Sequence, residues 1–271
     1  MRAVLLGLLQ AITEFLPISS SGHLLLAPRL VGEEASSLTF DVGLHLGTTV
    51  AVIGYFWRDW TGIIGDGLHD AATSGWRIGR WGPRSRLGLW IALATLPAVF
   101  AGLLLEQTIE DHLREPWLVG TMLVSFGLLI GVLDSWGGTV GRLFDMTPLR
   151  ALIVGVAQAL ALVPGVSRSG VTIAAARGLG FDRPSAARFA LLLSAPVVLG
   201  AVTLQLVEAL RGDEAVAWGP LLLGAAVSSV AGAFVIRGLL AYLESHTLRL
   251  FVWYRIALGL AVIGASAMGA F

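Results

Sequence analysis

The chain contains no cysteine and no lysine, and only 13% of its 271 residues are charged. The lack of cysteine excludes disulfides and thiolate metal sites. The lack of lysine excludes any mechanism that needs a lysine amine as base or nucleophile. Soluble domains have about 25% charged residues. The low charge is therefore typical of a protein that lies mostly inside a lipid bilayer.

Hydrophobic residues, by contrast, are abundant. They make up 56% of the sequence, the mean hydropathy is +0.81, and 18 arginines balance 18 acidic residues. This composition predicts an all-α polytopic membrane protein in contact with membrane lipids. A net charge of zero gives no reason to expect a polyanionic partner, so we expect no nucleic acid.

Six apolar segments have the length of a membrane-spanning helix, for which about 20 residues are needed. We expect transmembrane helices at residues 40–58, 86–106, 116–134, 184–208, 218–240 and 250–270. Two further segments, Leu5–His23 and Ile153–Thr172, are interrupted by proline, serine and glycine. Irregular backbone at membrane depth is tolerated where protein or a water-filled cavity satisfies its polar groups. We therefore predict two re-entrant helix-loop-helix segments.

The two interrupted segments are copies of one another, offset by 148 residues. The matched pairs are Gly7 and Gly155, Gln10 and Gln158, Ser19 and Ser167, Ser21 and Ser169, and Gly22 and Gly170. This duplication predicts a single integral membrane domain, 1–271, with repeat halves at 1–135 and 149–271. Broken helices in inverted-topology repeats place binding sites where the halves meet.

The arginines predict the orientation of the chain, because cytoplasmic loops are enriched in basic residues. Thirteen arginines, Arg177 and Arg255 among them, fall in loops expected on one side of the membrane, and four fall on the other. The arginine-rich side is predicted to be cytoplasmic, with both termini outside. The segment 58–86 is interpreted as an interfacial connector. The site between the re-entrant loops is then expected to face the external side.

The second loop has the composition of a phosphate or pyrophosphate cradle. Arg168 offers a planar fork for bidentate phosphate binding, and an arginine within a membrane segment is a functional candidate. Glycine and hydroxyl side chains around it add donors and close backbone approach. These substrate-binding candidates are Gly165, Ser167, Ser169 and Thr172. The alternative is a polar hinge in which Arg168 pairs with a carboxylate.

The first loop supplies the acid–base groups. Gln10 and Glu14 are four residues apart and share one helix face. Glu14 is a candidate general base, or, with Gln10, a ligand for a hard cation. The alternative is that Glu14 is the structural partner of Arg168. Polar residues near predicted helix ends, Asp41 and His45 among them, are weaker candidates.

A serine triplet followed by glycine and histidine completes the first loop. Ser19 and Ser21 are candidates for substrate binding, and Ser20 and His23 for catalysis. Histidine is the usual proton shuttle near neutral pH. Three nucleophiles stay open, namely Ser20, His23 and a metal-bound water, and we favour Ser20 with His23 and Glu14 assisting. The copies differ in chemistry, because Leu162 stands at the position that matches Glu14.

These motifs resemble those of the BacA-type undecaprenyl pyrophosphate phosphatases over essentially the whole chain. The family's (E/Q)xxxE motif stands as Gln10 to Glu14, its PGxSRSxxT motif as Pro164 to Thr172, and its SS(T/S)GH element as Ser19 to His23. Gln10 in place of a glutamate removes one carboxylate and weakens a two-carboxylate metal site.

The resemblance implies hydrolysis of undecaprenyl pyrophosphate to undecaprenyl phosphate and inorganic phosphate, which recycles the lipid carrier of cell-wall synthesis. It also implies a link to bacitracin resistance, a place in the bacterial inner membrane, and a divalent cation, Mg²⁺ or Ca²⁺. The implied fold, six transmembrane helices plus two re-entrant segments, agrees with the interpretation from the residues.

Two other functions remain alternatives. A PAP2-type lipid phosphatase shares SSGH at Ser20 to His23 but needs a lysine, and a second histidine that is absent between Arg168 and His246. A transporter that flips polyprenyl phosphate is compatible with inverted repeats. Small and aromatic residues on several spans would allow a homodimer.

Overall fold

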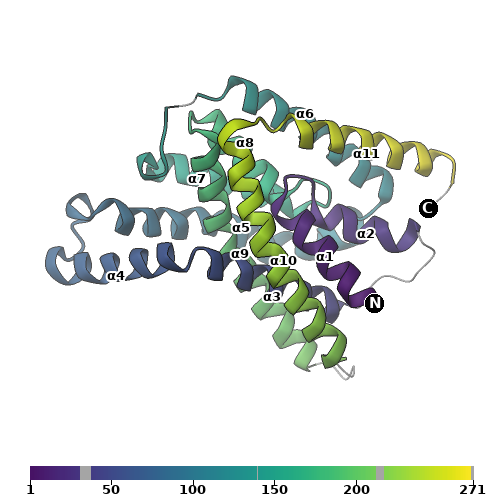
Figure 1. Ribbon diagram of the computed structural model, residues 1–271, viewed down its shortest axis with the longest axis horizontal. Helices are drawn as coiled ribbons and strands as arrows, with labels where there is room; N and C mark the ends of the chain where they lie inside the picture. Colours follow the sequence, from purple (N-terminus) through teal and green to yellow (C-terminus); the bar gives the residue numbers. More distant parts are fainter. Residues whose placement is uncertain (31–37, 139, 212–216, 270–271) are drawn as a thin grey trace.

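The computed structural model describes residues 1–30, 38–138, 140–211 and 217–269. The regular secondary structure of these ranges is helical, apart from one isolated bridge between Gly141 and Phe181 (Figure 1). The first half contains α1 (Arg2–Phe15), α2 (Ser20–Leu30), α3 (Leu38–Tyr55), α4 (Trp57–Ser74), α5 (Pro83–His112) and α6 (Pro116–Trp136), with the short 3-10 helix η1 (Ile78–Arg80).

The second half repeats this order without a counterpart of α4. It contains α7 (Pro148–Ala159), α8 (Arg168–Gly178), α9 (Arg183–Arg211), α10 (Trp218–Ser245) and α11 (Arg249–Ala267), with the 3-10 helices η2 (Leu143–Asp145) and η3 (Leu160–Leu162). The predicted helix breaks are confirmed, because α1 and α2 are separated at Pro17, and α7 and α8 at Pro164.

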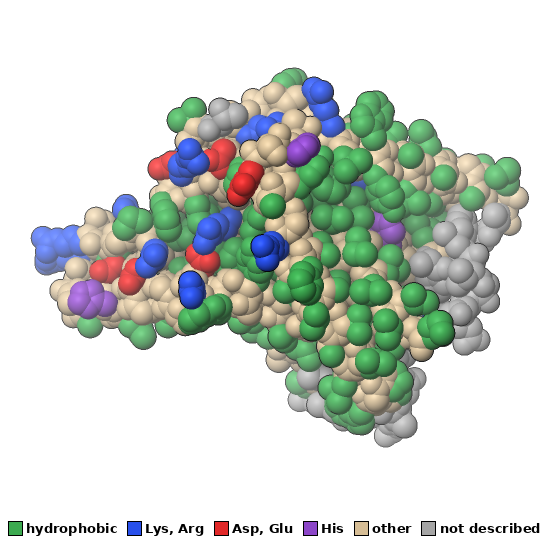
Figure 2. Space-filling view, in the orientation of Figure 1, with side chains coloured by type: hydrophobic (Ala, Val, Ile, Leu, Met, Phe, Trp, Pro, Cys, Tyr) green, Lys and Arg blue, Asp and Glu red, His purple; other side chains and the backbone are tan. Residues whose placement is uncertain are grey.

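Five described helices are long and apolar enough to cross a membrane. They are Pro83–Leu105, Pro116–Trp136, Arg183–Gln205, Trp218–Ser245 and Arg249–Ala267. All five overlap predicted spans, whereas α3, which covers the other predicted span, is not among them. Charged side chains lie mainly on the left half and along the top of this face, over the α4–α5 arm and above it, and hydrophobic ones predominate on the right half (Figure 2). The chain is a helical multi-pass membrane protein.

The connector predicted at 58–86 is itself largely helical. α4 packs against α5 and projects with it from the body of the molecule (Figure 1). Asp70 on α4 accepts from the Ser85 hydroxyl at 2.6 Å and the Gly82 amide at 2.7 Å, and these bonds lower the pKa of its carboxyl. The sequence did not predict this helix because charged residues and glycines interrupt the apolar residues of α4.

The first helix of each half packs on a helix of the other half, and a glycine lies at each contact. α1 packs on α10, where a Cβ on Gly7 would lie 2.9 Å from the Gly224 carbonyl oxygen. α7 packs on α5, where a Cβ on Gly155 would meet the Ala94 carbonyl oxygen. The matched glycines of the duplicated segments therefore have the same role in packing. Each lets one helix lie directly on the backbone of the other half.

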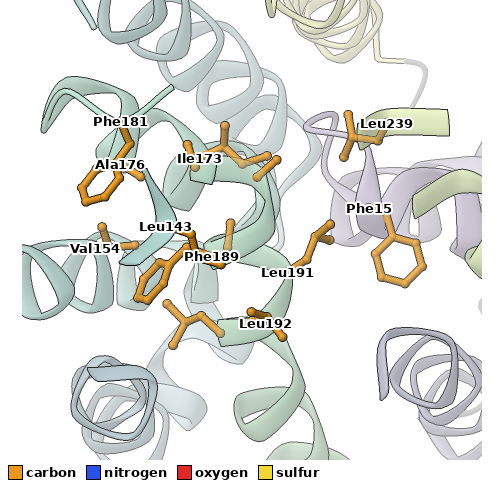
Figure 3. Close-up of a cluster of buried hydrophobic side chains, with 14 of the residues drawn as sticks. Phe15, Leu143, Val154, Ile173, Ala176, Phe181, Phe189, Leu191, Leu192 and Leu239 are labelled. Atoms are coloured by element: carbon orange, nitrogen blue, oxygen red, sulfur yellow. The ribbon is translucent and has the colours of Figure 1, made fainter. Parts of the chain in front are cut away.

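The hydrophobic core runs across both halves. In Figure 3, Phe15 of α1 and Leu239 of α10 lie on one side, Val154 and Phe181 on the other, and Leu191 of α9 between them. All five side chains are buried. α9 packs directly against α8, α3 and α5, while α1 is held by α10 and α7 by α5.

A buried ionic cluster anchors the C-terminal end of α8. Arg177 Nε donates to Asp134 Oδ1 at 2.9 Å, and Arg183 Nε donates to the same oxygen at 2.8 Å. The Leu248 amide donates to Asp134 Oδ2 at 3.1 Å. Arg177 lies within α8 and is only 1% exposed, so it is not the loop residue that the sequence suggested. Its ion pair with Asp134 joins α8 to α6.

The contact between α6 and α11 generates a testable prediction. A Cβ on Gly259 would lie 2.6 Å from the Gly120 carbonyl oxygen, whereas one on Gly264, also on α11, would meet nothing within 4 Å. We expect Gly259→Ala to lower the unfolding free energy by about 1–3 kcal/mol through overpacking. Thermal unfolding in detergent, followed by tryptophan fluorescence, measures this. Equal midpoints for Gly259→Ala and the control Gly264→Ala would contradict the packing argument.

Candidate functional site

The two loops between the broken helices have the same local geometry. Ser19 and Ser167 have φ of 78° and 73°, and they are the only non-glycine residues with positive φ in the described ranges. The Ser19 hydroxyl accepts from the Gly22 amide, and the Ser167 hydroxyl accepts from the Gly170 amide. Each serine thus caps the helix that follows its loop.

These two serines carry backbone strain. A non-glycine residue in a sparsely populated backbone region costs about 1–3 kcal/mol and persists where the surrounding structure enforces it. Such strain clusters at functional sites. The Ser19 and Ser21 hydroxyls are 3.3 Å apart, as are those of Ser167 and Ser169. Both strained serines therefore carry a second hydroxyl beside them, as predicted from the matched sequences.

Glu14 joins the two loops. It lies near the end of α1, is buried, and accepts three hydrogen bonds from side chains. The donors are the Ser20 hydroxyl at 2.6 Å, the Gln10 amide nitrogen at 3.2 Å and Arg168 Nη1 at 3.3 Å. Three donors, one of them cationic, stabilise an ionised carboxylate. The structure therefore brings together four predicted site residues.

Arg168 begins α8, and its side chain is 26% exposed. Within the described residues, Glu14 is the only partner of its guanidinium, and only Nη1 takes part. The other N–H groups are therefore available to an anion that enters the site. The Thr172 hydroxyl, fully buried, donates to the Arg168 carbonyl at 2.7 Å. Thr172 thus supports the backbone that carries Arg168.

Two other residues of the second loop hold the loops together. The Ser169 hydroxyl donates to the Leu16 carbonyl in the first loop at 3.1 Å. Gly165 has a φ of 95°, and a Cβ there would lie 2.7 Å from the Val119 carbonyl oxygen. The predicted cradle glycine is therefore required by the turn and by close packing on α6.

His45 of α3 is part of the site, although its sequence context ranked it as a weak candidate. Its Nδ1 lies 3.0 Å from the Gln10 amide nitrogen and 3.7 Å from Glu14 Oε2. Because an amide nitrogen donates, His45 Nδ1 accepts. An isolated histidine within a predicted span was the only available signal.

His23 lies on α2, one turn after Ser20. Its Nδ1 is 2.7 Å from the Ser19 carbonyl oxygen, and its Nε2 is 2.6 Å from the Tyr254 hydroxyl. The predicted proton shuttle is therefore beside the Ser20–Glu14 pair along the helix, with no direct bond to either. Tyr254, on α11, is a site neighbour that the sequence did not indicate.

Arg255 contacts both loops. It is fully buried, and its guanidinium donates to the carbonyls of Pro17 at 3.4 Å, Gly165 at 2.8 Å and Val166 at 3.0 Å. Arg255 lies within α11 and not in the turn before it, where the sequence analysis counted it.

The site has oxygen ligands that fit a hard cation whose remaining coordination positions are filled by the substrate. Gln10 Oε1 is buried and has no hydrogen-bond partner among the described residues, and it belongs to the same side chain that contacts Glu14. No group of three His, Cys, Asp or Glu side chains suited to a metal occurs in the described ranges. Mg²⁺ is commonly bound by one or two carboxylates plus substrate phosphates, which this donor set allows.

Comparison with known proteins gives a consistent result. The family model described as bacitracin resistance protein BacA matches residues 3–261. A protein of Geobacter sulfurreducens is 47% identical over 266 residues, covering 97% of each chain. One from Desulforudis audaxviator is 42% identical over 262 residues, covering 97% of this chain and 96% of the relative. Both relatives are named undecaprenyl-diphosphatase.

Arg255 gives a prediction about the integrity of the site. Lysine keeps the charge but lacks the planar fork that bonds three carbonyls. We expect Arg255→Lys to lower the unfolding free energy by about 1–3 kcal/mol or more, because at least one buried carbonyl loses its donor. Thermal unfolding in detergent measures this, with the exposed Arg249→Lys as control. Identical midpoints for the two variants would refute the role of Arg255.

Proposed function

Because the chain belongs to the BacA family, we propose that it hydrolyses undecaprenyl pyrophosphate to undecaprenyl phosphate and inorganic phosphate. The observation that carries this proposal is the 2.6 Å hydrogen bond from the Ser20 hydroxyl to Glu14, which also pairs with Arg168. A nucleophile, a base and an anion-binding group thus stand together. Phosphoryl transfer depends mainly on such positioning and charge stabilisation.

Arg168 binds the terminal phosphoryl group of the substrate. Its guanidinium sits at the N-terminus of α8, where backbone amides and the helix dipole also favour an anion. Binding of the pyrophosphate there competes with Glu14 for the guanidinium. Release of Glu14 from the arginine makes the carboxylate a better base at the moment when substrate is present.

Ser20 is the proposed nucleophile. Its oxygen attacks the terminal phosphorus while its proton passes to Glu14, and the bond to the bridging oxygen breaks, releasing undecaprenyl phosphate. Water then hydrolyses the phosphoserine. The alternatives were His23 and a bound water. Both ring nitrogens of His23 already lie at hydrogen-bond distance from Ser19 and Tyr254, which favours Ser20 over His23.

A divalent cation, Mg²⁺ or Ca²⁺, is part of the proposal. Glu14 and the unpartnered Gln10 Oε1 would hold it together with phosphate oxygens of the substrate. When bound, the cation supplies charge stabilisation to the transferred phosphoryl group.

We further propose six transmembrane helices, α3 included, and two re-entrant segments in inverted halves. Support comes from the exchange of α1 onto α10 and α7 onto α5. The start of α1 and the end of α11 lie at the end of the molecule opposite the α4–α5 turn (Figure 1). With arginines concentrated near that turn, the positive-inside rule puts the termini and the site opening outside the bacterial inner membrane. The homodimer stays a prediction.

The first test separates an enzyme from a polyprenyl-phosphate transporter. Purified protein in detergent, with Mg²⁺ or Ca²⁺ and undecaprenyl pyrophosphate, should release phosphate, because hydrolysis requires no bilayer. Arg168→Ala should lose nearly all release, since the charge on the departing phosphoryl group is left unstabilised. Colorimetric phosphate assay measures both. Absence of release by folded wild-type protein would favour the transporter.

A second prediction concerns the nucleophile. Rapid quench with a substrate labelled at the terminal phosphate should trap a phosphoserine at Ser20, located by peptide mapping. Ser20→Ala should abolish the label and turnover, and Glu14→Gln should slow turnover by about 10²–10⁴-fold through loss of the base.

Ser135→Ala is the matched control, because Ser135 is exposed and bonds only within α6. It should react like the wild type. Turnover by the wild type without any label would indicate that water attacks directly, and label at His23 would identify that residue as the nucleophile.

A further inference from the structure

Tyr254 holds one nitrogen of His23. The Tyr254 hydroxyl oxygen lies 2.6 Å from His23 Nε2, and the two rings are stacked with centroids 5.7 Å apart and an interplanar angle of 7°. The residues come from α11 and α2, 231 positions apart in sequence. Neither the family motifs nor the duplicated segments include Tyr254.

The direction of these hydrogen bonds follows from the other nitrogen. His23 Nδ1 lies 2.7 Å from the Ser19 carbonyl oxygen, which can only accept, so Nδ1 carries a proton. In a neutral imidazole the second nitrogen is then an acceptor. The Tyr254 hydroxyl therefore donates to Nε2. His23 is held in a single tautomer whose free base faces the phenol.

The proposed two-step reaction needs a second base. In the first step Glu14 takes the proton of Ser20, to which it is directly bonded. In the second step Glu14 returns that proton to the serine oxygen as it leaves phosphorus, so it is not available to the attacking water. His23 is on the same helix face as Ser20, three residues on, where side chains are neighbours.

Tyr254 lies nearer the surface of the protein than the acid–base pair of the site does. It is 43% exposed, while Glu14 on the inner side of the site is 9% exposed. A phenol can donate one proton while it accepts another. The Tyr254 hydroxyl can therefore take a proton on its oxygen while it gives its own proton to His23 Nε2.

We propose that Tyr254 is a proton-relay residue for hydrolysis of the phosphoserine, an inference that rests on the proposed function. The water oxygen bonds to phosphorus as its proton moves to the phenol oxygen, and the phenol's own proton moves to His23 Nε2. The bond from phosphorus to the Ser20 oxygen breaks, and that oxygen takes the proton held by Glu14. The imidazolium then returns its extra proton to solvent through the same hydroxyl.

The test is Tyr254→Phe, which keeps the stacked ring and removes only the hydroxyl. We expect turnover to fall at least about tenfold because acid–base assistance to the second step is lost. Formation of phosphoserine should keep its rate, so labelled enzyme accumulates to a higher steady-state level than in the wild type. Rapid quench with labelled substrate measures both steps. A purely structural effect would slow formation as well.

Tyr242→Phe is the matched control. Tyr242 also stacks on a histidine, His246, with centroids 4.5 Å apart, but neither contacts the site. This variant should match the wild type in turnover and in labelled enzyme. Thermal unfolding of both variants checks that the fold is retained.

The double variant Tyr254→Phe with His23→Ala completes the test. If the hydroxyl acts through the imidazole, the double variant turns over no more slowly than His23→Ala alone. Wild-type turnover in Tyr254→Phe, equal slowing of both steps, or additive losses in the double variant would each overturn the relay. Failure of the wild type to form phosphoserine would instead overturn the Ser20 mechanism, which the wild-type arm reports separately.

Discussion

The arrangement of the site depends on the fully buried guanidinium of Arg255, which bonds carbonyls of both interrupted loops. Carbonyls buried against this guanidinium need a donor from the protein, and each buried group left unsatisfied is costly. A single planar fork satisfies three of them and fixes the distance between the loops. The contact of Arg168 with Glu14 exists only while that distance is kept. A structural arginine on α11 thus makes a functional pair possible between residues 154 positions apart.

Equal geometry and unequal chemistry characterise the two loops. Ser19 and Ser167 share the same strained backbone and the same cap, which indicates that both copies have retained one loop geometry. Within that geometry, Ser20 stands where the other copy has Arg168, so one copy presents a hydroxyl and the other a cation. The copies also differ at Glu14, because the matching residue of the second copy is Leu162, which has no carboxylate. The shared loop geometry positions the side chains, and in the proposed mechanism the residues that differ between the copies carry out the reaction.

The sequence was sufficient to predict the breaks, most spans and the contact partners Gln10, Glu14, Ser20 and Arg168, because short motifs encode them. It was not sufficient for Arg255, Arg177 or Tyr254. An arginine near the end of an apolar run has the same local pattern whether it lies in a cytoplasmic loop or folds inward. The difference is decided by carbonyls and carboxylates up to 238 residues away. The helical connector α4 was missed for a related reason, since its charged face contacts α5 and removes the apolar pattern of a span.

Helix α8 links the two buried polar clusters of the molecule. Its first residue, Arg168, reaches the site, and Arg177, near its other end, is tied to Asp134. Arg177 follows Arg168 by nine residue steps, about 13.5 Å at a rise of 1.5 Å per residue. With Arg177 fixed by several carbonyls and a carboxylate, α8 has little freedom to slide along its axis. A substrate can then draw Arg168 away from Glu14 only by moving the side chain. In the proposed mechanism the binding energy of the substrate is therefore directed to replacing Glu14 by phosphate on Arg168, the step that frees Glu14 to act as base.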